Sequence, residues 1–221
     1  MTLEEAIAKI KPLDHNAMEI AQKRWDSIAK PLHSLGKLET LLIQIAGITG
    51  NAEVDLSRRG LIAMCADNGV VEEGVTQTGQ EVTAIVAENF LKYDTSVGVM
   101  CKQNHAEIFP VDMGMVTDTK VRTDHKIAYG TQNMTKGPAM TREQAVKGLE
   151  AGIDMVRELN DKGYRILATG EMGIGNTTTS SAVASVLLKQ PVEEMTGRGA
   201  GLTSEGLVRK INAIKKSHCI K

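Results

Sequence analysis

Residues 165–188 read RILATGEMGIGNTTTSSAVASVLL and decide the fold of the chain. The segment begins with a short apolar run typical of a buried strand, passes through glycines at 170, 173 and 175, and ends in small and apolar residues typical of a helix. Glycine permits tight turns and a close approach of the backbone to a ligand. The free amides and the macrodipole at a helix start favour an anion. The stretch therefore predicts a phosphate-binding site in an α/β enzyme.

The regions around this stretch repeat the alternation of strand and helix. We expect strands over 61–66, 107–111, 164–168 and, more weakly, 126–129. We expect helices over 81–91, 95–102, 177–188 and 204–216, and a long helix that opens at Thr141 and stops at Gly163. Thr141 and Gln144 form a capping box that marks the start of the longest helix, and Pro110 suits an edge strand better than a central one. This alternation predicts an α/β fold, a parallel Rossmann-like sheet with helices on both faces.

The first fifty residues carry a different pattern. Three amphipathic segments read as helices, and Asp14 is placed to cap the second of them. We therefore expect a small N-terminal helical subdomain over 1–50 and an α/β nucleotide-binding domain over 51–221.

Composition argues against several classes of function. The chain has 221 residues, a formal net charge of −1 and six aromatic residues, so we expect no nucleic-acid partner. No apolar run reaches the roughly 20 residues that span a bilayer, so we expect no membrane partner. Three cysteines without paired spacing indicate free thiols in a cytoplasmic protein. Five scattered histidines show no ligand spacing, so we expect neither a metal nor a cofactor.

The expected strands end in acidic residues. Ligands of parallel sheets bind at the carboxyl ends of the strands, so Asp67, Asp112 and Glu171 are expected to converge on one crevice. The glycine stretch is not a Walker loop, because no lysine precedes its threonines, and it matches the dinucleotide fingerprint only loosely. The alternative is a structural strand-to-helix turn capped by Asn176 or Thr177. A carboxylate beside a phosphate is unfavourable, so Glu171 is better explained by a sugar hydroxyl or a developing cation.

A second glycine loop, TGRGAGL, covers residues 196–202, and a helix that carries Lys210 follows it. From the sequence alone, Lys210 is expected on a solvated helix face, and Arg198 is expected to be a surface charge of the loop.

Several motifs occur along nearly the whole chain in an order that resembles one known family. They are KP at 30–31, SLGKLE at 34–39, CADNGV at 65–70, VDMG at 111–114, NM at 133–134, GPAM at 137–140 and GEMGIGNTT at 170–178. Together they resemble the nicotinate-nucleotide–dimethylbenzimidazole phosphoribosyltransferase family. The motif around Glu171 is the most specific of them.

This resemblance implies a reaction. Phosphoribose moves from nicotinate mononucleotide to a ring nitrogen of 5,6-dimethylbenzimidazole, or of a related lower-ligand base, and gives α-ribazole 5′-phosphate in cobamide biosynthesis. Oxocarbenium character develops at C1′, and attack from the opposite face inverts the configuration. The enzyme must hold the phosphate, stabilise the positive sugar and remove the azole proton. The resemblance also implies a two-fold homodimer.

The resemblance assigns roles to individual residues. Glu171 is the catalytic residue, placed against the ribose or the reacting azole. Thr78 falls where the family has a small hydroxyl residue near the azole ring, and Val86 falls where members that use benzimidazoles typically have Gln, so the base could differ. The substrate-binding residues are Asp67, Thr78, Val86, Gly173, Gly175, Asn176, Thr177, Thr178 and Lys210, with the loop from Gly173 to Thr178 and Lys210 holding the 5′-phosphate.

The end of the chain departs from the family. The second glutamate, which is the family's proposed general base, lies in a C-terminal segment, whereas this sequence stops at Lys221. We therefore expect a truncated gene product, a piece of a longer chain or a natural half. Two other functions stay open: a nucleotide-binding module of the same fold with impaired catalysis, and an unrelated α/β phosphate-binding enzyme such as a kinase, against which the missing Walker lysine argues.

Overall fold

The computed structural model describes residues 1–220. The chain forms two compact units that divide between Ser57 and Arg58, a few residues after the expected boundary. Each unit is described by itself.

The N-terminal unit contains three helices, α1 (Leu3–Ala8), α2 (His15–Ser27) and α3 (Lys37–Thr49). Asp14 caps α2 as predicted, because its side chain accepts a hydrogen bond of 2.9 Å from the backbone nitrogen of Ala17. Apart from Glu39 on α3, the buried residues of these helices are small: Ala17 and Ala21 on α2, and Ala46 and Gly47 on α3. This allows α2 and α3 to pack closely.

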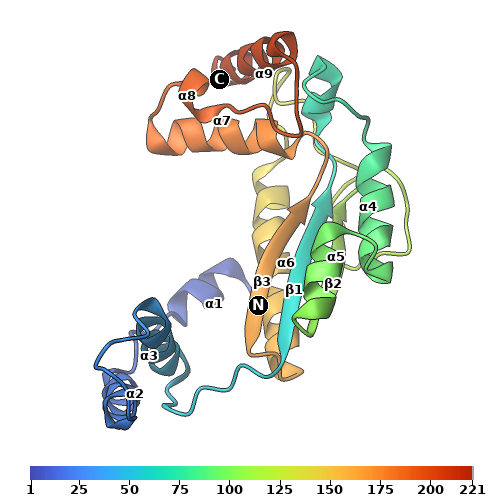
Figure 1. The fold of residues 1–221 in the computed structure, drawn as a ribbon. Helices are drawn as coiled ribbons and strands as arrows, with labels where there is room; N and C mark the ends of the chain where they lie inside the picture. Colours follow the sequence, from blue (N-terminus) through green and yellow to red (C-terminus); the bar gives the residue numbers. More distant parts are fainter. Residues whose placement is uncertain (221) are drawn as a thin grey trace. The chain divides into compact units, whose positions relative to one another are not determined.

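The second unit is built on a parallel sheet of three strands, β1 (Arg59–Ala66), β2 (Ala106–Gly114) and β3 (Ile166–Met172), in the order β2-β1-β3 (Figure 1). The apolar β1 lies in the centre, as its lack of polar alternation indicates. Pro110 lies in β2, outside the central strand. The predicted α/β class is confirmed.

Helices cover both faces of this sheet (Figure 1). On one face, α4 (Glu81–Lys92) and α5 (Ser96–Gln103) cover a cluster that includes Ala63 and Cys65 of β1. On the other face, α6 (Arg142–Asp161) contributes Met155 and Leu159 to a cluster with Ile62 of β1. In that second layer the rings of Phe109 and Tyr164 meet edge to face, with their centroids 5.1 Å apart. Alternate residues of β1 therefore serve the two layers, as the pleat requires.

The remaining elements gather at the carboxyl end of the sheet (Figure 1). They are the 3-10 helix η1 (Gly69–Glu73) and the helices α7 (Asn176–Leu188), α8 (Val192–Met195) and α9 (Ser204–His218). One cluster joins Ala182 of α7, Val192 of α8 and Ile214 of α9, and another joins Val70 of η1 to Ala213 of α9. The structure thus packs four elements around the point where β3 passes into α7.

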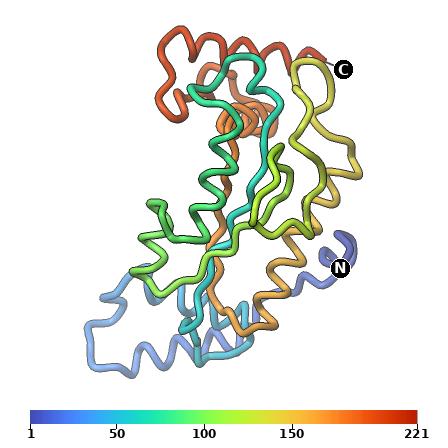
Figure 2. The backbone as a smooth tube through the Cα atoms, turned by 90° about the vertical axis from the view of Figure 1, so that its right-hand side faces the viewer, coloured from blue at the N-terminus to red at the C-terminus, as the bar shows by residue number. Residues whose placement is uncertain are grey.

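Two expectations about the strands are wrong. Residues 126–129 form no strand; they belong to a long irregular segment between β2 and α6 (Figure 2). An isolated bridge joins Arg122 of this segment to Val111 of β2. The strand expected over 164–168 begins at Ile166 and continues to Met172, and it is not buried: four of its seven residues are exposed, since β3 has β1 as its only neighbour among the described strands.

None of the helices within residues 1–220 combines the length and apolar character that crossing a membrane requires.

Candidate functional site

The loop between β3 and α7 is built around two glycines that no other residue can replace without strain. A Cβ on Gly173 would lie 2.2 Å from the carbonyl oxygen of Ala66. Gly175 has a φ of +91° and is the N-cap of α7, with no side chain bonded to the helix start. The cap expected from Asn176 or Thr177 is therefore absent: these residues lie inside the first turn of α7, whose leading amides have no side-chain cap.

Two side chains from other elements hold the loop in place. Asn68, just after β1, donates its side-chain amide to the carbonyl oxygen of Ile174 at 3.1 Å. The backbone nitrogen of Ile174 donates to the hydroxyl of Thr83, a fully buried residue of α4, at 3.0 Å. The carbonyl oxygen and the backbone nitrogen of Ile174 are thus both hydrogen-bonded, and these two bonds hold the shape of the loop without a ligand.

The second glycine loop closes over the first turn of α7. Gly199 comes so near that an added Cβ would lie 2.7 Å from the hydroxyl of Thr177. A cavity of about 120 Å³ remains between the two loops and the segment after η1. Its lining includes five of the residues predicted from the sequence: Thr78, Gly173, Gly175, Asn176 and Thr177.

Lys210 lies beneath this cavity and contradicts the expectation of a solvated face. Its side chain is 1% exposed, and its ammonium donates to the hydroxyl of Thr177 at 2.7 Å and to the carbonyl oxygen of Gly197 at 3.0 Å. Within residues 1–220 no carboxylate is ion-paired with it. Burial lowers the pKa of Lys210. A buried cation with only neutral partners favours an anion nearby, and the first turn of α7 is the open place for one.

Thr178 adds an unused polar group to the same turn. The residue is fully buried, and its hydroxyl has no hydrogen-bond partner. It does not line the cavity itself, but it follows Thr177, which does.

Glu171 lies at the end of β3, two residues before Gly173. Its carboxylate accepts a hydrogen bond from the side-chain amide of Asn176. Although the residue as a whole is exposed, its carboxylate is partly desolvated, which raises its pKa, and the bond from Asn176 opposes that shift. A carboxylate thus stands beside the proposed anion site without lining its cavity.

The three acids do lie near one another at the carboxyl end of the sheet, where burial and then the charge of each acid raise the pKa of the Cys65 thiol, but the shared open crevice is wrong for two of them. Asp67 and Asp112 are fully buried and accept backbone hydrogen bonds, and Asp112 also pairs with the ammonium of Lys126 at 3.1 Å. Asp67 accepts from the nitrogen of Val116 at 2.9 Å, and Asp112 accepts from the nitrogen of Met115 at 2.7 Å. Burial raises the pKa of Asp67, while a hydrogen bond with Thr83 lowers it. Both acids shape the carboxyl end of the sheet and do not open into a cavity.

Comparison with known proteins identifies the family of the chain. The profile of the DBI_PRT family, described as phosphoribosyltransferase, matches residues 10–221. The chain belongs to this family. Curated nicotinate-nucleotide–dimethylbenzimidazole phosphoribosyltransferases from Ruminiclostridium cellulolyticum and Clostridium tetani are 51% and 46% identical to it, over 98% and 97% of the chain. The chain spans 62% and 60% of the length of these two relatives.

Solved structures of the phosphoribosyltransferase family agree with the fold. The CobT protein of Thermus thermophilus has a TM-score of 0.84 and 36% identity, over 91% of this chain and 61% of its own. A second structure, named as the nicotinate-nucleotide–dimethylbenzimidazole phosphoribosyltransferase of the same organism, has a TM-score of 0.81 and 34% identity over 93% of this chain and 62% of its own. The resemblance predicted from the motifs is confirmed, while the roles of individual residues stay predictions.

Val86 lies on α4, outside the glycine loop. It packs against the buried cluster between α4 and the sheet and does not line the cavity of the glycine loop. Its contact with a base stays a prediction.

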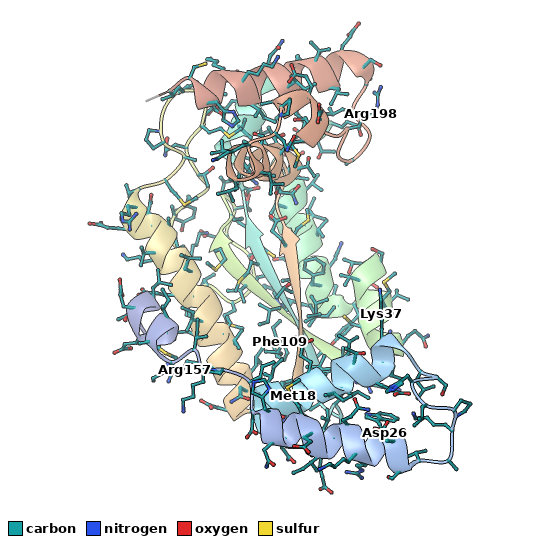
Figure 3. All side chains as sticks on the ribbon, turned by 90° about the vertical axis from the view of Figure 1, so that its left-hand side faces the viewer. Met18, Asp26, Lys37, Phe109, Arg157 and Arg198 are labelled. Atoms are coloured by element: carbon teal, nitrogen blue, oxygen red, sulfur yellow. The ribbon has the colours of Figure 1, made fainter. Side chains whose placement is uncertain are left out.

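Sequence reasoning missed Thr83 and the part of Arg198 in the cavity wall. Thr83 is a polar residue on the apolar face of α4, and this was the available signal. Arg198 is exposed as a residue and lines the cavity, and its guanidinium donates to the carbonyl oxygen of Leu202 at 2.7 Å (Figure 3). Its exposure agrees with the expected surface charge, whereas its place in the lining of the cavity was not expected.

Proposed function

We propose that the protein transfers phosphoribose from nicotinate mononucleotide to 5,6-dimethylbenzimidazole, or to a related lower-ligand base, and forms α-ribazole 5′-phosphate in cobamide biosynthesis. The observation that carries the proposal is the first turn of α7, open to the cavity and backed by the buried ammonium of Lys210. The names of the relatives supply the two substrates. Neither a metal nor a cofactor, a nucleic acid or a membrane enters the proposal.

The 5′-phosphate is assigned to the loop from Gly173 to Thr178. The amides of Asn176 and Thr178 already donate to the carbonyl oxygens of Gly173 and Gly175 at 3.0 and 2.9 Å, so the other amides of this turn are the donors assigned to the phosphate. There the macrodipole of α7 and the Lys210 ammonium both favour a dianion. Lys210 does not line the cavity, so it acts through Thr177, whose hydroxyl is oriented by the hydrogen bond that it accepts from the ammonium. The buried hydroxyl of Thr178 is a further donor that side-chain movement could turn toward the phosphate oxygens.

The ribose then extends from the helix start toward the end of β3. Glu171 is placed there to stabilise positive charge at C1′ or to receive the azole proton. Nicotinate leaves from a cationic pyridinium and needs little acid assistance, so a carboxylate is better suited to this place than a proton donor. Thr78, which also lines the cavity, is assigned to the base.

The direct test is to incubate the chain with nicotinate mononucleotide and 5,6-dimethylbenzimidazole and to detect nicotinate and α-ribazole 5′-phosphate by liquid chromatography and mass spectrometry. A reaction without the base distinguishes transfer from hydrolysis. Product formation supports the proposal. Tight binding of nicotinate mononucleotide without any product would instead identify a nucleotide-binding module.

Replacement of Gly175 by valine is expected to weaken the binding of inorganic phosphate by about 1–3 kcal/mol, because charged hydrogen bonds at the helix start are lost. The native φ of +91° strains a β-branched residue, and the new Cβ would lie 3.1 Å from a methyl group of Val71. Gly137→Val is the control, because nothing lies within 4 Å of its Cβ position. Calorimetric titration with phosphate measures both variants, and equal affinity in Gly175→Val would contradict the assignment.

We further propose that the protein forms a two-fold homodimer and that it is located in the cytoplasm. Free cysteines are the rule in that compartment, and the three cysteines of this chain are free. On the N-terminal helices, Leu38, Leu41 and Ile48 of α3 are large apolar residues that are exposed in the single chain and suited to a partner surface. Light scattering across micromolar concentrations is expected to give the dimer mass, and a monomer at every concentration counts against it. Cell fractionation tests the compartment.

A further inference from the structure

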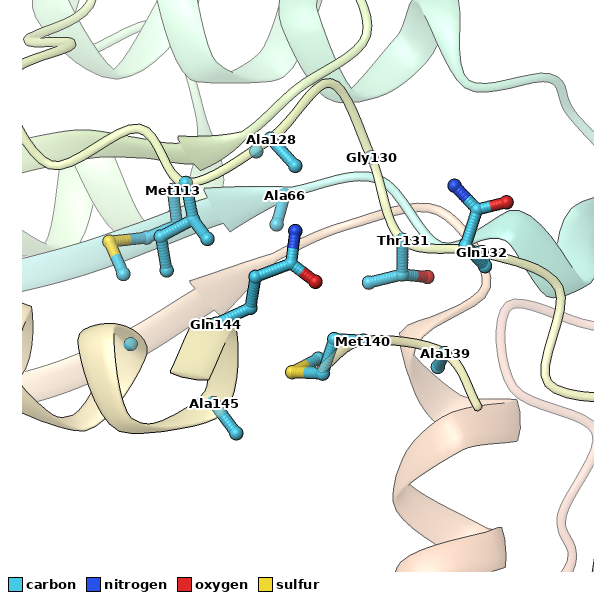
Figure 4. Close-up of a pocket in the computed structure, with 13 residues that line it drawn as sticks. Ala66, Met113, Ala128, Gly130, Thr131, Gln132, Ala139, Met140, Gln144 and Ala145 are labelled. Carbon is cyan, nitrogen blue, oxygen red and sulfur yellow. The ribbon is translucent and has the colours of Figure 1, made fainter. Parts of the chain in front are cut away.

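A second pocket lies between the carboxyl ends of β1 and β2 and the first two turns of α6 (Figure 4). Its volume is about 230 Å³, and it shares no lining residue with the cavity of the glycine loop. We call it the α6 pocket. The carboxyl ends of parallel strands are where ligands of such sheets bind. The mechanism proposed above uses none of its residues.

The walls of the α6 pocket determine the shape and charge of a ligand. Glycines and alanines from the strand ends, the loops and α6 leave flat surfaces, and Met113, Ile127 and Met140 are its larger apolar residues. Met140 is 44% exposed. No charged residue is among those that line it. Mostly apolar walls with a few convergent polar groups are typical of sites for small uncharged molecules.

Gln144 supplies a polar group whose orientation is fixed. In the capping box of α6 its side-chain oxygen accepts a hydrogen bond from the backbone nitrogen of Thr141 at 2.9 Å. A backbone N–H can bond only to the oxygen of this amide, so the nitrogen end is directed away from Thr141 and into the pocket (Figure 4). The pocket is therefore equipped with a fixed donor for a ligand that carries an acceptor.

Thr131 connects the α6 pocket with the glycine loop. It lines the pocket, and its hydroxyl oxygen accepts from the backbone nitrogen of Gly69 at 3.0 Å. The residue before Gly69, Asn68, holds Ile174 of the glycine loop. A ligand in the pocket would therefore contact the same turn that shapes the anion site.

We propose that the α6 pocket binds an uncharged, flat compound of one or two fused rings that has a hydrogen-bond acceptor on its edge. An apolar cavity of roughly 150 Å³ is enough for benzene, so the larger α6 pocket has room for a second ring. Gln144 donates to the acceptor, and the methionines contact the ring faces.

The test uses quinoline, which has a ring acceptor, and naphthalene, which has the same shape without one. Methyl-labelled methionine in the full chain reports binding by NMR, and Met113→Leu and Met140→Leu assign the two methyl signals. Quinoline is expected to shift both signals with a dissociation constant on the order of 1 mM, and to bind about fivefold more tightly than naphthalene, as one neutral hydrogen bond allows. Unchanged Met113 and Met140 signals at saturating quinoline would overturn the proposal.

Two variants separate the pocket from general surface binding. Gln144→Glu keeps the capping box, since glutamate is also a capping-box residue, but replaces the donor with an acceptor, so the preference for quinoline over naphthalene should disappear. Gly148→Leu fills the pocket, where a Cβ fits at 3.5 Å from Ile127, and should abolish binding. Gly152→Leu, one turn further along α6 and facing open space, should leave binding intact. Retained quinoline binding in Gly148→Leu, or a retained preference in Gln144→Glu, would show that the ring does not occupy the site as proposed.

Discussion

Glu171→Gln is expected to lower the rate of phosphoribosyl transfer by roughly 10²–10⁴-fold, the usual cost of losing a catalytic acid–base group. Glutamine keeps the shape of the side chain and an oxygen that accepts the bond from Asn176, so the loop should keep its structure. What disappears is the negative charge next to the developing cation and the capacity to receive the azole proton. Product formation under saturating substrates measures the effect.

The pH dependence gives this prediction a second readout. Partial desolvation raises the pKa of Glu171, and the carboxylate acts only in its ionised form, so the rate should fall as pH decreases through a pKa above the ordinary glutamate value. In Glu171→Gln this acidic limb should be missing. Glu193→Gln is the control, because it removes one exposed carboxylate of α8 that pairs with Lys215. Turnover that is unchanged in Glu171→Gln would make Glu171 only a residue of the turn.

The layered fold was predictable because six consecutive residues of β1, 61–66, indicate a strand that is buried on both faces. An apolar run with no polar alternation fits a central strand, and residues that alternate along it pack against α4 and α6. The segment 126–129 failed for a physical reason. Ile127 and Gly130 donate backbone hydrogen bonds to the end of β2 at 3.0 and 2.9 Å, but these contacts never form a regular ladder. Apolar residues that pack beside the end of a strand have the same sequence pattern as a short strand.

The candidate site was predictable where glycine was involved and less so where side chains from distant elements meet. Gly173 and Gly175 mark the loop by themselves, whereas the bonds from Asn68 and Thr83 depend on how β1 and α4 lie around it. The burial of Lys210 had a signal that the expectation of a solvated face overlooked. It follows Gly206 by four residues and precedes Ala213 by three, and all three lie on the buried face of α9.

Replacement of Lys210 by methionine is expected to separate anion binding from stability. Loss of a charge-assisted interaction should weaken the binding of phosphate by about 1.5–3 kcal/mol, or roughly 10- to 150-fold. The phosphate-free chain, in contrast, should be no less stable near pH 7, because methionine fills a similar volume and removes a buried cation that has only neutral partners. Titration calorimetry and denaturant unfolding measure the two quantities.

The sign of the pH effect on stability follows from the lowered pKa of Lys210. Below that pKa the lysine is protonated in both the folded and unfolded chain, and the cost of burying the charge is fully present. Between the lowered pKa and the ordinary value the unfolded chain binds more protons, so the free energy of unfolding rises with pH, and above the ordinary value the cost is gone. This rise should be absent in Lys210→Met.

Lys215→Met is the matched control, since it removes a cation from the same helix at an exposed position paired with Glu193. It should leave both phosphate affinity and the high-pH rise in stability nearly unchanged, because exposed charges are screened. A Lys210→Met chain that loses stability but binds phosphate as before would make Lys210 a structural residue of α9. The opposite result is weaker phosphate binding in an equally stable chain. It would mean that the fold tolerates the buried Lys210 charge because a bound anion compensates for it.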